Sequence, residues 1–197
     1  QDQVILTVNI LVSPYRNGSF YFRSDSTMIR ALTDFYIPDY IDSISAVPIL
    51  CIRSERSGKS VAAKFADRYL GPFTCGLIIK PCLHEEAVLP EDRVFVKNAL
   101  DYSTVIPYDL LPADRLEGFI SGQRPVRIMV NGITKVSVSS TPDKDGLYRR
   151  FAEISRYCSL RTGDFLAFEL SDAVPVQKDS RLILAFGVER DISIIIH

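Results

Sequence analysis

A Gly-Lys-Ser triplet at residues 58–60 stands before an amphipathic stretch, and this combination is typical of a loop that cradles phosphate groups. A complete phosphate loop also needs a glycine five positions before Gly58, so that the backbone can wrap around the phosphates. Here that position is Arg53, and no apolar strand runs directly into a glycine-rich loop. The triplet is therefore interpreted as a solvated turn that leads into a helix.

A thiol and an imidazole also lie close together in the sequence, at Cys82 and His84. Positions this near on a strand or loop seldom bring their side chains into the contact that nucleophilic catalysis requires. A zinc site needs four ligands, usually in close pairs, and no second pair accompanies these residues. All four cysteines, Cys51, Cys75, Cys82 and Cys158, are therefore expected to be free thiols.

The elements that would position any reactive group are mostly strands. Apolar or alternating runs predict strands at 4–12, 19–22, 43–52, 74–80, 164–170, 181–187 and 191–197. At 126–140, Asn131-Gly132 separates two alternating runs, which predicts a hairpin with a type I′ turn.

Two helices are predicted between the strands. The first begins after Ser60 as its N-cap and ends at Gly71, a left-handed C-terminal position that is followed by Pro72. The second covers residues 146–160, where apolar residues recur at helical spacing.

Length and charge limit the function classes. The 197 residues fit one domain, 1–197, and 47% of them are hydrophobic. A net charge of −1 gives no electrostatic case for a nucleic-acid partner or an anionic membrane, and no apolar run approaches a membrane span. No signal peptide is visible at the start, so a cytoplasmic location is expected by default.

Several segments, in order, resemble the fumarylacetoacetate hydrolase family, in particular its short bacterial single-domain members. These are "FYFRSDSTMIR", "FYIPDY", a following strand, "GKSVAAKFADRYLGPFTCGLIIK" and the later "SLRTGDFLAF". The likeness spans most of the chain and is weak at 82–96 and 108–125.

The resemblance implies a mixed, β-rich (α+β) fold, a β-sandwich or roll with a few flanking helices, usually as a homodimer. It also implies cleavage or isomerisation of acylpyruvate-like diketo acids. In the family a divalent ion, Mg²⁺ or Ca²⁺, holds the substrate enolate on carboxylate ligands. A His–Glu pair near the N-terminus activates water.

The family's chemical positions are not preserved in this chain. Its Glu-x-Glu motif falls on Val47 and Ile49, and the Asp of its Gly-Ile-Asp strand falls on Ile78. No carboxylate occurs anywhere in "SISAVPILCI" or "FTCGLIIK", so a shift of alignment does not restore the ligands.

The remaining catalytic motifs are also altered. The family lysine falls on Lys97 or Asn98, and the likeness of Ala99-Leu100-Asp101 to Gly-Phe-Asp favours Asn98. The Thr-Gly-Thr-Pro loop reads Phe168-Glu169-Leu170-Ser171. The N-terminal motif retains Asn9 but has no His, and the two histidines are His84 and His197.

These losses predict a non-catalytic member of the family, a binding or partner protein without metal. The former metal positions are Val47, Ile49 and Ile78. The candidate pocket residues are Asn9, Lys97, Asn98, Asp101, Leu170, His84 and Glu85. A homodimer is expected, or a heteromer with an active relative.

Two alternatives keep an enzyme. The first is a diketo-acid hydrolase or isomerase with a relocated site, for which the stretch from His84 through Glu85, Glu86, Glu91 and Asp92 to Asp101 supplies acidic groups. The second is a conventional metal-dependent hydrolase whose ligands are not recognised.

Overall fold

The computed structural model describes residues 8–16, 18–29, 34–121, 125–138, 141–187 and 191–197. Within these ranges the larger sheet has eight strands, in the order β2-β1-β9-β4-β5-β6-β3 with β10 also paired to β4. The strands are β1 (Ile10–Ser13), β2 (Tyr21–Arg23), β3 (Met28–Ile29), β4 (Ile41–Ser54), β5 (Leu70–Leu83), β6 (Thr104–Val105), β9 (Phe165–Glu169) and β10 (Val174–Val176).

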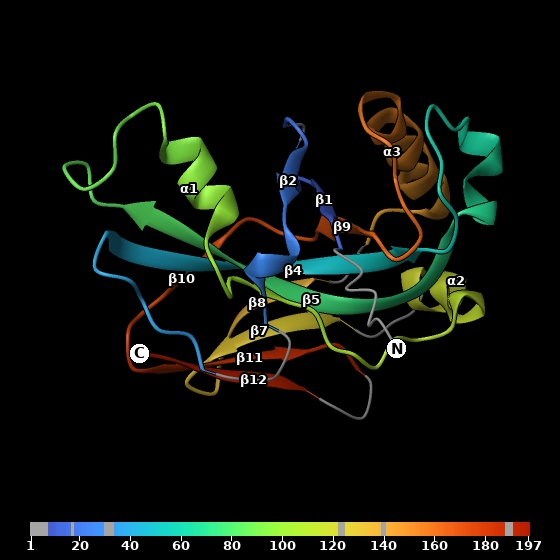
Figure 1. Cartoon of the computed structure of the whole chain (residues 1–197). Coiled ribbons are helices and arrows are strands. Elements are labelled where there is room, and N and C mark those ends of the chain that lie inside the picture. The colour runs from blue at the N-terminus through green and yellow to red at the C-terminus, as the bar shows by residue number, and fades with distance from the viewer. Residues whose placement is uncertain (1–7, 17, 30–33, 122–124, 139–140, 188–190) are drawn as a thin grey trace, which may run out of the picture.

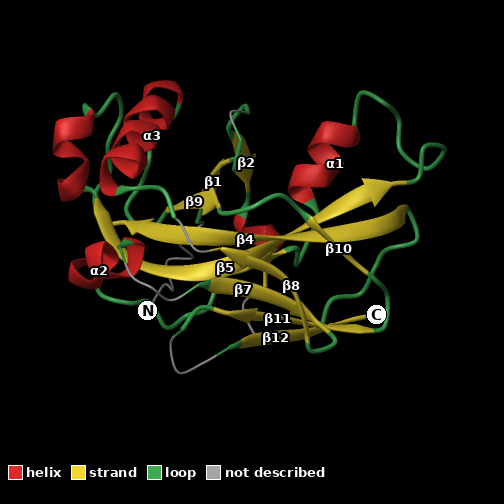
Figure 2. Cartoon of the chain, turned by 180° about the vertical axis from the view of Figure 1, so that it is seen from behind, coloured by secondary structure: helices red, strands yellow, loops and turns green. Residues whose placement is uncertain are grey.

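A second sheet of four strands lies beside the first, in the order β12-β11-β7-β8. Its strands are β7 (Val126–Val130), β8 (Ile133–Val138), β11 (Ser180–Ala185) and β12 (Ile192–Ile196). The helices are α1 (Arg93–Ala99), α2 (Leu116–Ile120) and α3 (Lys144–Tyr157). Short 3₁₀ turns cover Asp25–Thr27, Ala63–Arg68 and Ala113–Arg115. This strand-rich α+β architecture agrees with the predicted fold class (Figures 1 and 2). None of the described helices is long and apolar enough to cross a membrane.

The larger sheet has apolar side chains on both faces. One face packs with the smaller sheet into the main core, to which Leu50 and Leu77 contribute together with Ile128 and Leu182. The other face carries a smaller apolar cluster and lies on the side of α1 and α3 (Figure 1). We call it the inner face of the larger sheet. Strands that are buried on both faces have nearly continuous apolar sequences. For this reason β4 and β5 could be predicted from the sequence.

The predicted hairpin is confirmed in β7 and β8. Asn131 and Gly132 connect the strands with φ of 51° and 79°, the two left-handed conformations that a type I′ turn requires. The second predicted helix is also confirmed as α3, which begins at Lys144. The Asp143 side chain caps it by accepting a hydrogen bond from the backbone N–H of Gly146 at 2.7 Å.

The first predicted helix is wrong in type and extent. Residues 63–68 form a 3₁₀ helix, and Ser60 is no N-cap but has a φ of 53°. The backbone N–H groups of Gly58 and Ser60 instead donate to the carbonyls of Leu160 and Ser155, which ties the segment to the end of α3. Gly71 does not end a helix. It lies in β5, where a Cβ would come within 2.1 Å of Glu55 Cγ, so the strand needs glycine there.

All four cysteines are free, as predicted. Cys51 and Cys75 are both buried, on the neighbouring strands β4 and β5. Cys51 pairs with Thr74 across the strands and Cys75 with Leu50, so the two thiols project from opposite faces of the sheet. The pairing register therefore keeps them apart. Cys82 is exposed, and Cys158 is half-buried just after α3.

Candidate functional site

The three positions that the family resemblance assigns to metal ligands lie together on the inner face of the larger sheet. Val47 on β4 is the direct cross-strand partner of Ile78 on β5, and Ile49 is two residues further along β4 on the same side. All three side chains are fully buried. Ile49 and Ile78 belong to one apolar cluster, which also contains Val12 and Phe165.

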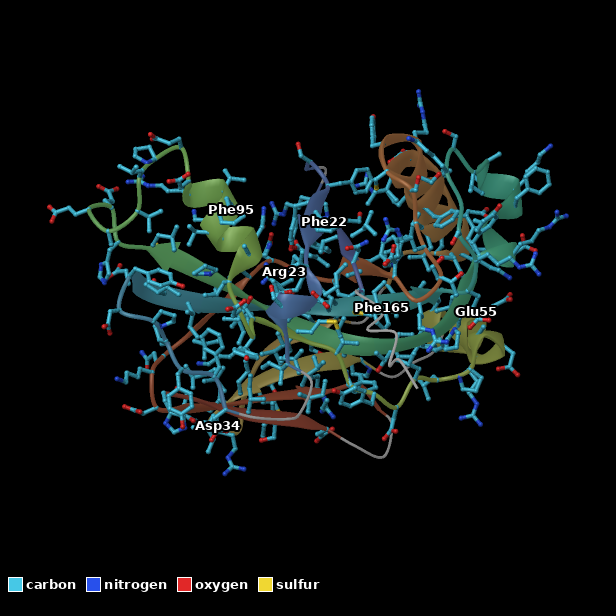
Figure 3. All side chains as sticks on the ribbon, in the orientation of Figure 1. Phe22, Arg23, Asp34, Glu55, Phe95 and Phe165 are labelled. Atoms are coloured by element: carbon cyan, nitrogen blue, oxygen red, sulfur yellow. The ribbon has the colours of Figure 1, made fainter. Side chains whose placement is uncertain are left out.

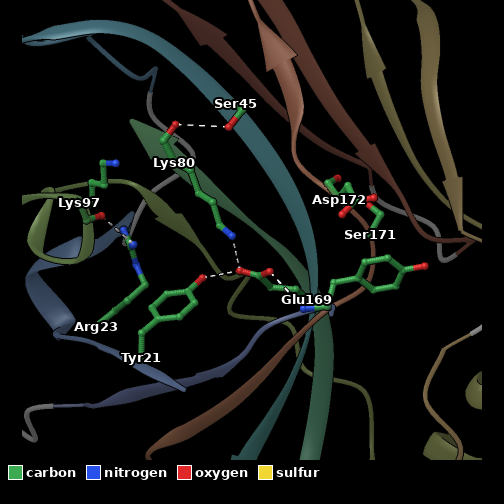
Figure 4. Close-up of polar contacts among 9 residues, drawn as sticks. Tyr21, Arg23, Ser45, Lys80, Lys97, Glu169, Ser171 and Asp172 are labelled. Atoms are coloured by element: carbon green, nitrogen blue, oxygen red, sulfur yellow. Dashed lines mark hydrogen bonds and ion pairs between the residues drawn. The ribbon is translucent and has the colours of Figure 1, made fainter. Parts of the chain in front are cut away.

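A buried carboxylate lies on the same face, next to these apolar positions. Glu169 ends β9 opposite Ile49, and its side chain is 5% exposed. Its Oε1 accepts a hydrogen bond from Tyr21 Oη at 2.6 Å and lies 2.6 Å from Lys80 Nζ, while its Oε2 accepts from the backbone N–H of Tyr15 at 3.2 Å (Figure 4). We call Tyr21, Lys80 and Glu169 the Glu169 cluster.

Strand register explains why these three side chains meet. Lys80 pairs with Ser45 on β4, two residues before the Val47–Ile78 pair, and therefore projects from the same face. Tyr21 pairs with Val12 on β1, and β1 runs beside β9. The three residues come from β2, β9 and β5, which are distant in sequence and alternate with β1 and β4 in the sheet.

Burial raises the pKa of Tyr21 above its usual range, and the charge and hydrogen bond of Glu169 raise it further. The phenol therefore stays protonated and donates to the carboxylate at any physiological pH. With an ammonium, a phenol and a backbone N–H directed at it, the charge of Glu169 is compensated within the chain.

Arg23 is a second buried charge on this face, with 1% of its surface exposed. Its Nε donates to Thr104 Oγ1 at 2.8 Å, one Nη donates to the Lys97 carbonyl at 3.3 Å, and the other donates to Ser103 Oγ. Burial lowers the pKa of Arg23 to about 10. The guanidinium thus joins β2 to β6 and to the last turn of α1.

A cavity of about 340 Å³ adjoins Glu169. Its lining includes Ser13, Tyr15, Arg150, Phe168 and Leu170. Two contacts hold the guanidinium of Arg150 in place. Its Nε donates to Ser13 Oγ at 2.9 Å, and its Cζ lies over the Phe20 ring, 4.1 Å from the ring centroid. One of its Nη atoms also contacts Glu153 at 2.8 Å.

The structure brings some of the predicted pocket residues to this region. Leu170 lines the cavity, and the Lys97 carbonyl accepts from Arg23. The backbone of Asn9 bonds to Phe165 and to the Asp164 carboxylate at the edge of the same face. Asn98 is on α1.

Three other predicted residues lie elsewhere. His84 and Glu85 are exposed in the turn after β5, where His84 Nδ1 is 3.7 Å from Asp42. The Glu85 carbonyl accepts a hydrogen bond from Arg93. Asp101 lines a different groove. Sequence reasoning did not single out Tyr21, Arg23 or Lys80, and it placed Glu169 in the segment that matches the family's Thr-Gly-Thr-Pro loop without giving it a role. The sequence does contain a signal for Lys80. Side chains two residues apart on a strand project from the same face, so Lys80 shares a face with Ile78 on β5.

The donor atoms on this face do not fit a divalent ion. Val47, Ile49 and Ile78 have no oxygen to offer, and hard cations need several oxygen ligands. Of the two buried carboxylates near this face, Glu169 is already bonded to Lys80 and Tyr21, and Asp164 at its edge accepts from the backbone N–H groups of Asn9 and Arg161. Among the described residues there is no group of three or more His, Cys, Asp or Glu placed to hold a metal.

Comparison with known proteins shows the fold. No family model and no curated protein sequence matches the chain. Among solved structures, maleylpyruvate hydrolase from Sphingobium sp. SYK-6 is similar with a TM-score of 0.75 and 17% identity, covering 95% of this chain and 69% of that one. Fumarylpyruvate hydrolase from Pseudomonas aeruginosa, in complex with Mn²⁺ and pyruvate, has a TM-score of 0.73 and 14% identity, covering 96% and 88%. A protein from Yersinia pestis CO92, described as of the fumarylacetoacetate hydrolase family, has a TM-score of 0.74 and 16% identity, covering 97% and 92%. The predicted fold is thereby confirmed.

Proposed function

We propose that the chain is a non-catalytic protein of the fumarylacetoacetate hydrolase fold, which binds a ligand or partner and uses no metal. The observation that supports this is the composition of the inner face. Apolar side chains take the three positions at which the family resemblance expects carboxylates, and Glu169 is neutralised by Lys80 instead of by an ion. Three carboxylates without a cation would repel one another, so apolar replacements suit a site that no longer holds an ion.

Metal binding gives the direct test. The purified protein should contain no stoichiometric Mg²⁺, Ca²⁺ or Mn²⁺ by elemental analysis. Millimolar concentrations of these ions should leave its melting temperature unchanged, because a ligand stabilises only a native state that it binds. It should also fail to hydrolyse acylpyruvates under conditions in which the Pseudomonas fumarylpyruvate hydrolase is active. A stoichiometric ion or turnover would contradict the proposal.

One observation favours a second candidate, a diketo-acid hydrolase or isomerase with a different site. Glu169, one member of the Glu169 cluster, lines a cavity, and similar folds in solved structures are hydrolases and isomerases of such compounds. In that case Lys80 and Tyr21 would offer hydrogen bonds to a developing enolate oxygen. Turnover that is lost in Lys80→Met and kept in Lys144→Met, which changes an exposed lysine on α3, would favour this candidate.

We also propose that the chain pairs with itself or with an active relative. The resemblance supports this. The apolar strand at 192–196 adds little support, because Ile192, Ile194 and Ile196 are buried within the chain. Residues 35–37 also hydrogen-bond along the end of β12 and cover part of that edge.

A further inference from the structure

An open groove of about 550 Å³ lies between residues 34–40 and the segment 95–102 around the end of α1. It shares no lining residue with the cavity beside Glu169. The lining is Asp34, Phe35, Tyr36, Pro38, Tyr40, Phe95, Val96, Ala99, Leu100, Asp101 and Tyr102. Figure 3 shows Phe95 on α1 and Asp34 near the smaller sheet. These two residues lie at opposite ends of the groove. We call it the aromatic groove.

One wall of the aromatic groove is fixed by backbone hydrogen bonds. The N–H groups of Phe35 and Ile37 donate to the carbonyls of Ile195 and His197 at 2.8 and 2.9 Å. Phe35 therefore turns inward and is buried, while Tyr36 turns outward and is 70% exposed. The His197 ring stacks on one face of the Tyr36 ring, with the ring centroids 4.7 Å apart. The other face of the Tyr36 ring remains available.

The opposite wall presents two more exposed rings. Phe95 is 72% exposed on α1, and Tyr102 is 61% exposed just beyond the helix. Tyr102 has a φ of 55°, a left-handed conformation that is uncommon for a bulky residue. Backbone outliers of this kind concentrate at functional sites.

The lining has the chemistry of a surface for an extended, basic ligand. Asp34 and Asp101 contribute carboxylates, and none of the described residues of the lining is a lysine or an arginine. In the part of the chain that the structure describes, Tyr36, Tyr40, Phe95 and Tyr102 form no ring pair with one another. Rings set apart in this way suit a chain that contacts them in succession, whereas a compact cation would need them close together.

We propose that the aromatic groove binds a proline-rich peptide segment that carries arginine or lysine. Such segments adopt the polyproline II helix without a large loss of entropy, and they dock into grooves lined by aromatic side chains. Proline rings would pack on Tyr36, Phe95 and Tyr102, and the basic side chains would pair first with Asp101. Asp34 would add a second carboxylate, although its Oδ1 accepts from the Ile195 N–H at 3.1 Å and its Oδ2 lies 3.3 Å from His197 Nε2. A symmetric contact between two copies fits the groove poorly, because it would place two concave surfaces and their carboxylates face to face.

The probe is the acetylated and amidated octapeptide Pro-Pro-Arg-Pro-Pro-Arg-Pro-Pro, and its matched control replaces both arginines with glutamates. Binding to the full chain is measured by fluorescence anisotropy of the labelled peptide and by amide chemical shifts of the protein. The variants are Tyr36→Ala, Phe95→Ala and Asp101→Asn. Tyr157→Ala removes an equally exposed ring on α3, outside the groove, and is the control.

The arginine peptide should bind saturably and shift amides in 34–40 and 95–102. Tyr36→Ala and Phe95→Ala should each weaken binding roughly fivefold or more, as truncation of aromatic anchors does. Asp101→Asn should weaken it and reduce its dependence on salt. Tyr157→Ala should bind like the parent. The proposal is overturned if no amides of these two segments shift at about 1 mM peptide. Equal binding of the glutamate peptide, or equal weakening by Tyr157→Ala, would also overturn it.

Discussion

Replacement of Lys80 by methionine tests whether a cation is needed on the inner face. The change keeps an unbranched apolar stem and removes the charged end group, so Glu169 stays buried with only Tyr21 and a backbone N–H as donors. Breaking a fully buried ion pair costs about 3–5 kcal/mol, and exposed pairs contribute about 0–1 kcal/mol. Because Lys80 is 36% exposed and Glu169 is 5% exposed, we expect an intermediate loss of about 2 kcal/mol in the free energy of unfolding.

The reverse change, Glu169→Gln, should cost less, about 1 kcal/mol, since the freed ammonium can turn to water and glutamine still accepts from Tyr21. The double variant should then be more stable than Lys80→Met alone.

Urea unfolding of all variants at pH 8 measures these differences. Lys144→Met is the matched control, because it breaks the exposed ion pair of Lys144 with Glu117 and should change stability by no more than about 0.5 kcal/mol. The reasoning is refuted if Lys80→Met costs no more than Lys144→Met, or if Glu169→Gln is the more damaging change at pH 8.

The remaining predictions concern thiols, the hairpin and assembly. Burial raises the pKa of Cys51 and Cys75, so at pH 8 both should stay unreactive toward a thiol reagent until the protein unfolds, whereas exposed Cys82 should react at once. Rapid labelling of either buried thiol in native protein would contradict this. Gly132→Ala should lower the free energy of unfolding by about 1 kcal/mol through backbone strain alone, since a Cβ there meets nothing within 4 Å. An unchanged urea midpoint would argue against the strain. Light scattering at micromolar concentration should give twice the 22.1 kDa chain mass, and a monomer mass would exclude self-pairing.

Sequence predicted the elements whose signals are local. The β7–β8 hairpin follows from Asn131-Gly132, and β4 and β5 follow from continuous apolar runs, because in each case neighbouring residues determine the outcome. The prediction of an α-helix after Gly58 was wrong for the opposite reason. Its helical spacing is real, but hydrogen bonds to residues near 155–160 hold its backbone in another conformation. Tertiary contacts overrode a local preference there.

The candidate site was only partly predictable, because strand pairing creates it. Val47, Ile49 and Ile78 were found by aligning motifs, and each lies inside a predicted strand. Glu169 and Tyr21 are separated by 148 residues and meet only through the order β2-β1-β9-β4. A charged residue at the end of one strand gives no sign of which other strand will supply its partner.

The charges on the inner face give a consistent physical account of the site. A divalent ion surrounded by three carboxylates has a local charge of −1, and stripping the ion from such a site leaves mutual repulsion. Here the three apolar residues contribute no charge, and Lys80 balances Glu169. That leaves Arg23, which donates hydrogen bonds to oxygens of Thr104, Ser103 and Lys97 and whose charged form Glu169 also favours electrostatically. Among Lys80, Arg23 and Glu169 one positive charge is in excess, and a divalent cation that approached them would meet two fixed cations and a carboxylate that is already paired. For this chain, binding an ion at these positions would require new carboxylates and also the removal of Lys80 from Glu169.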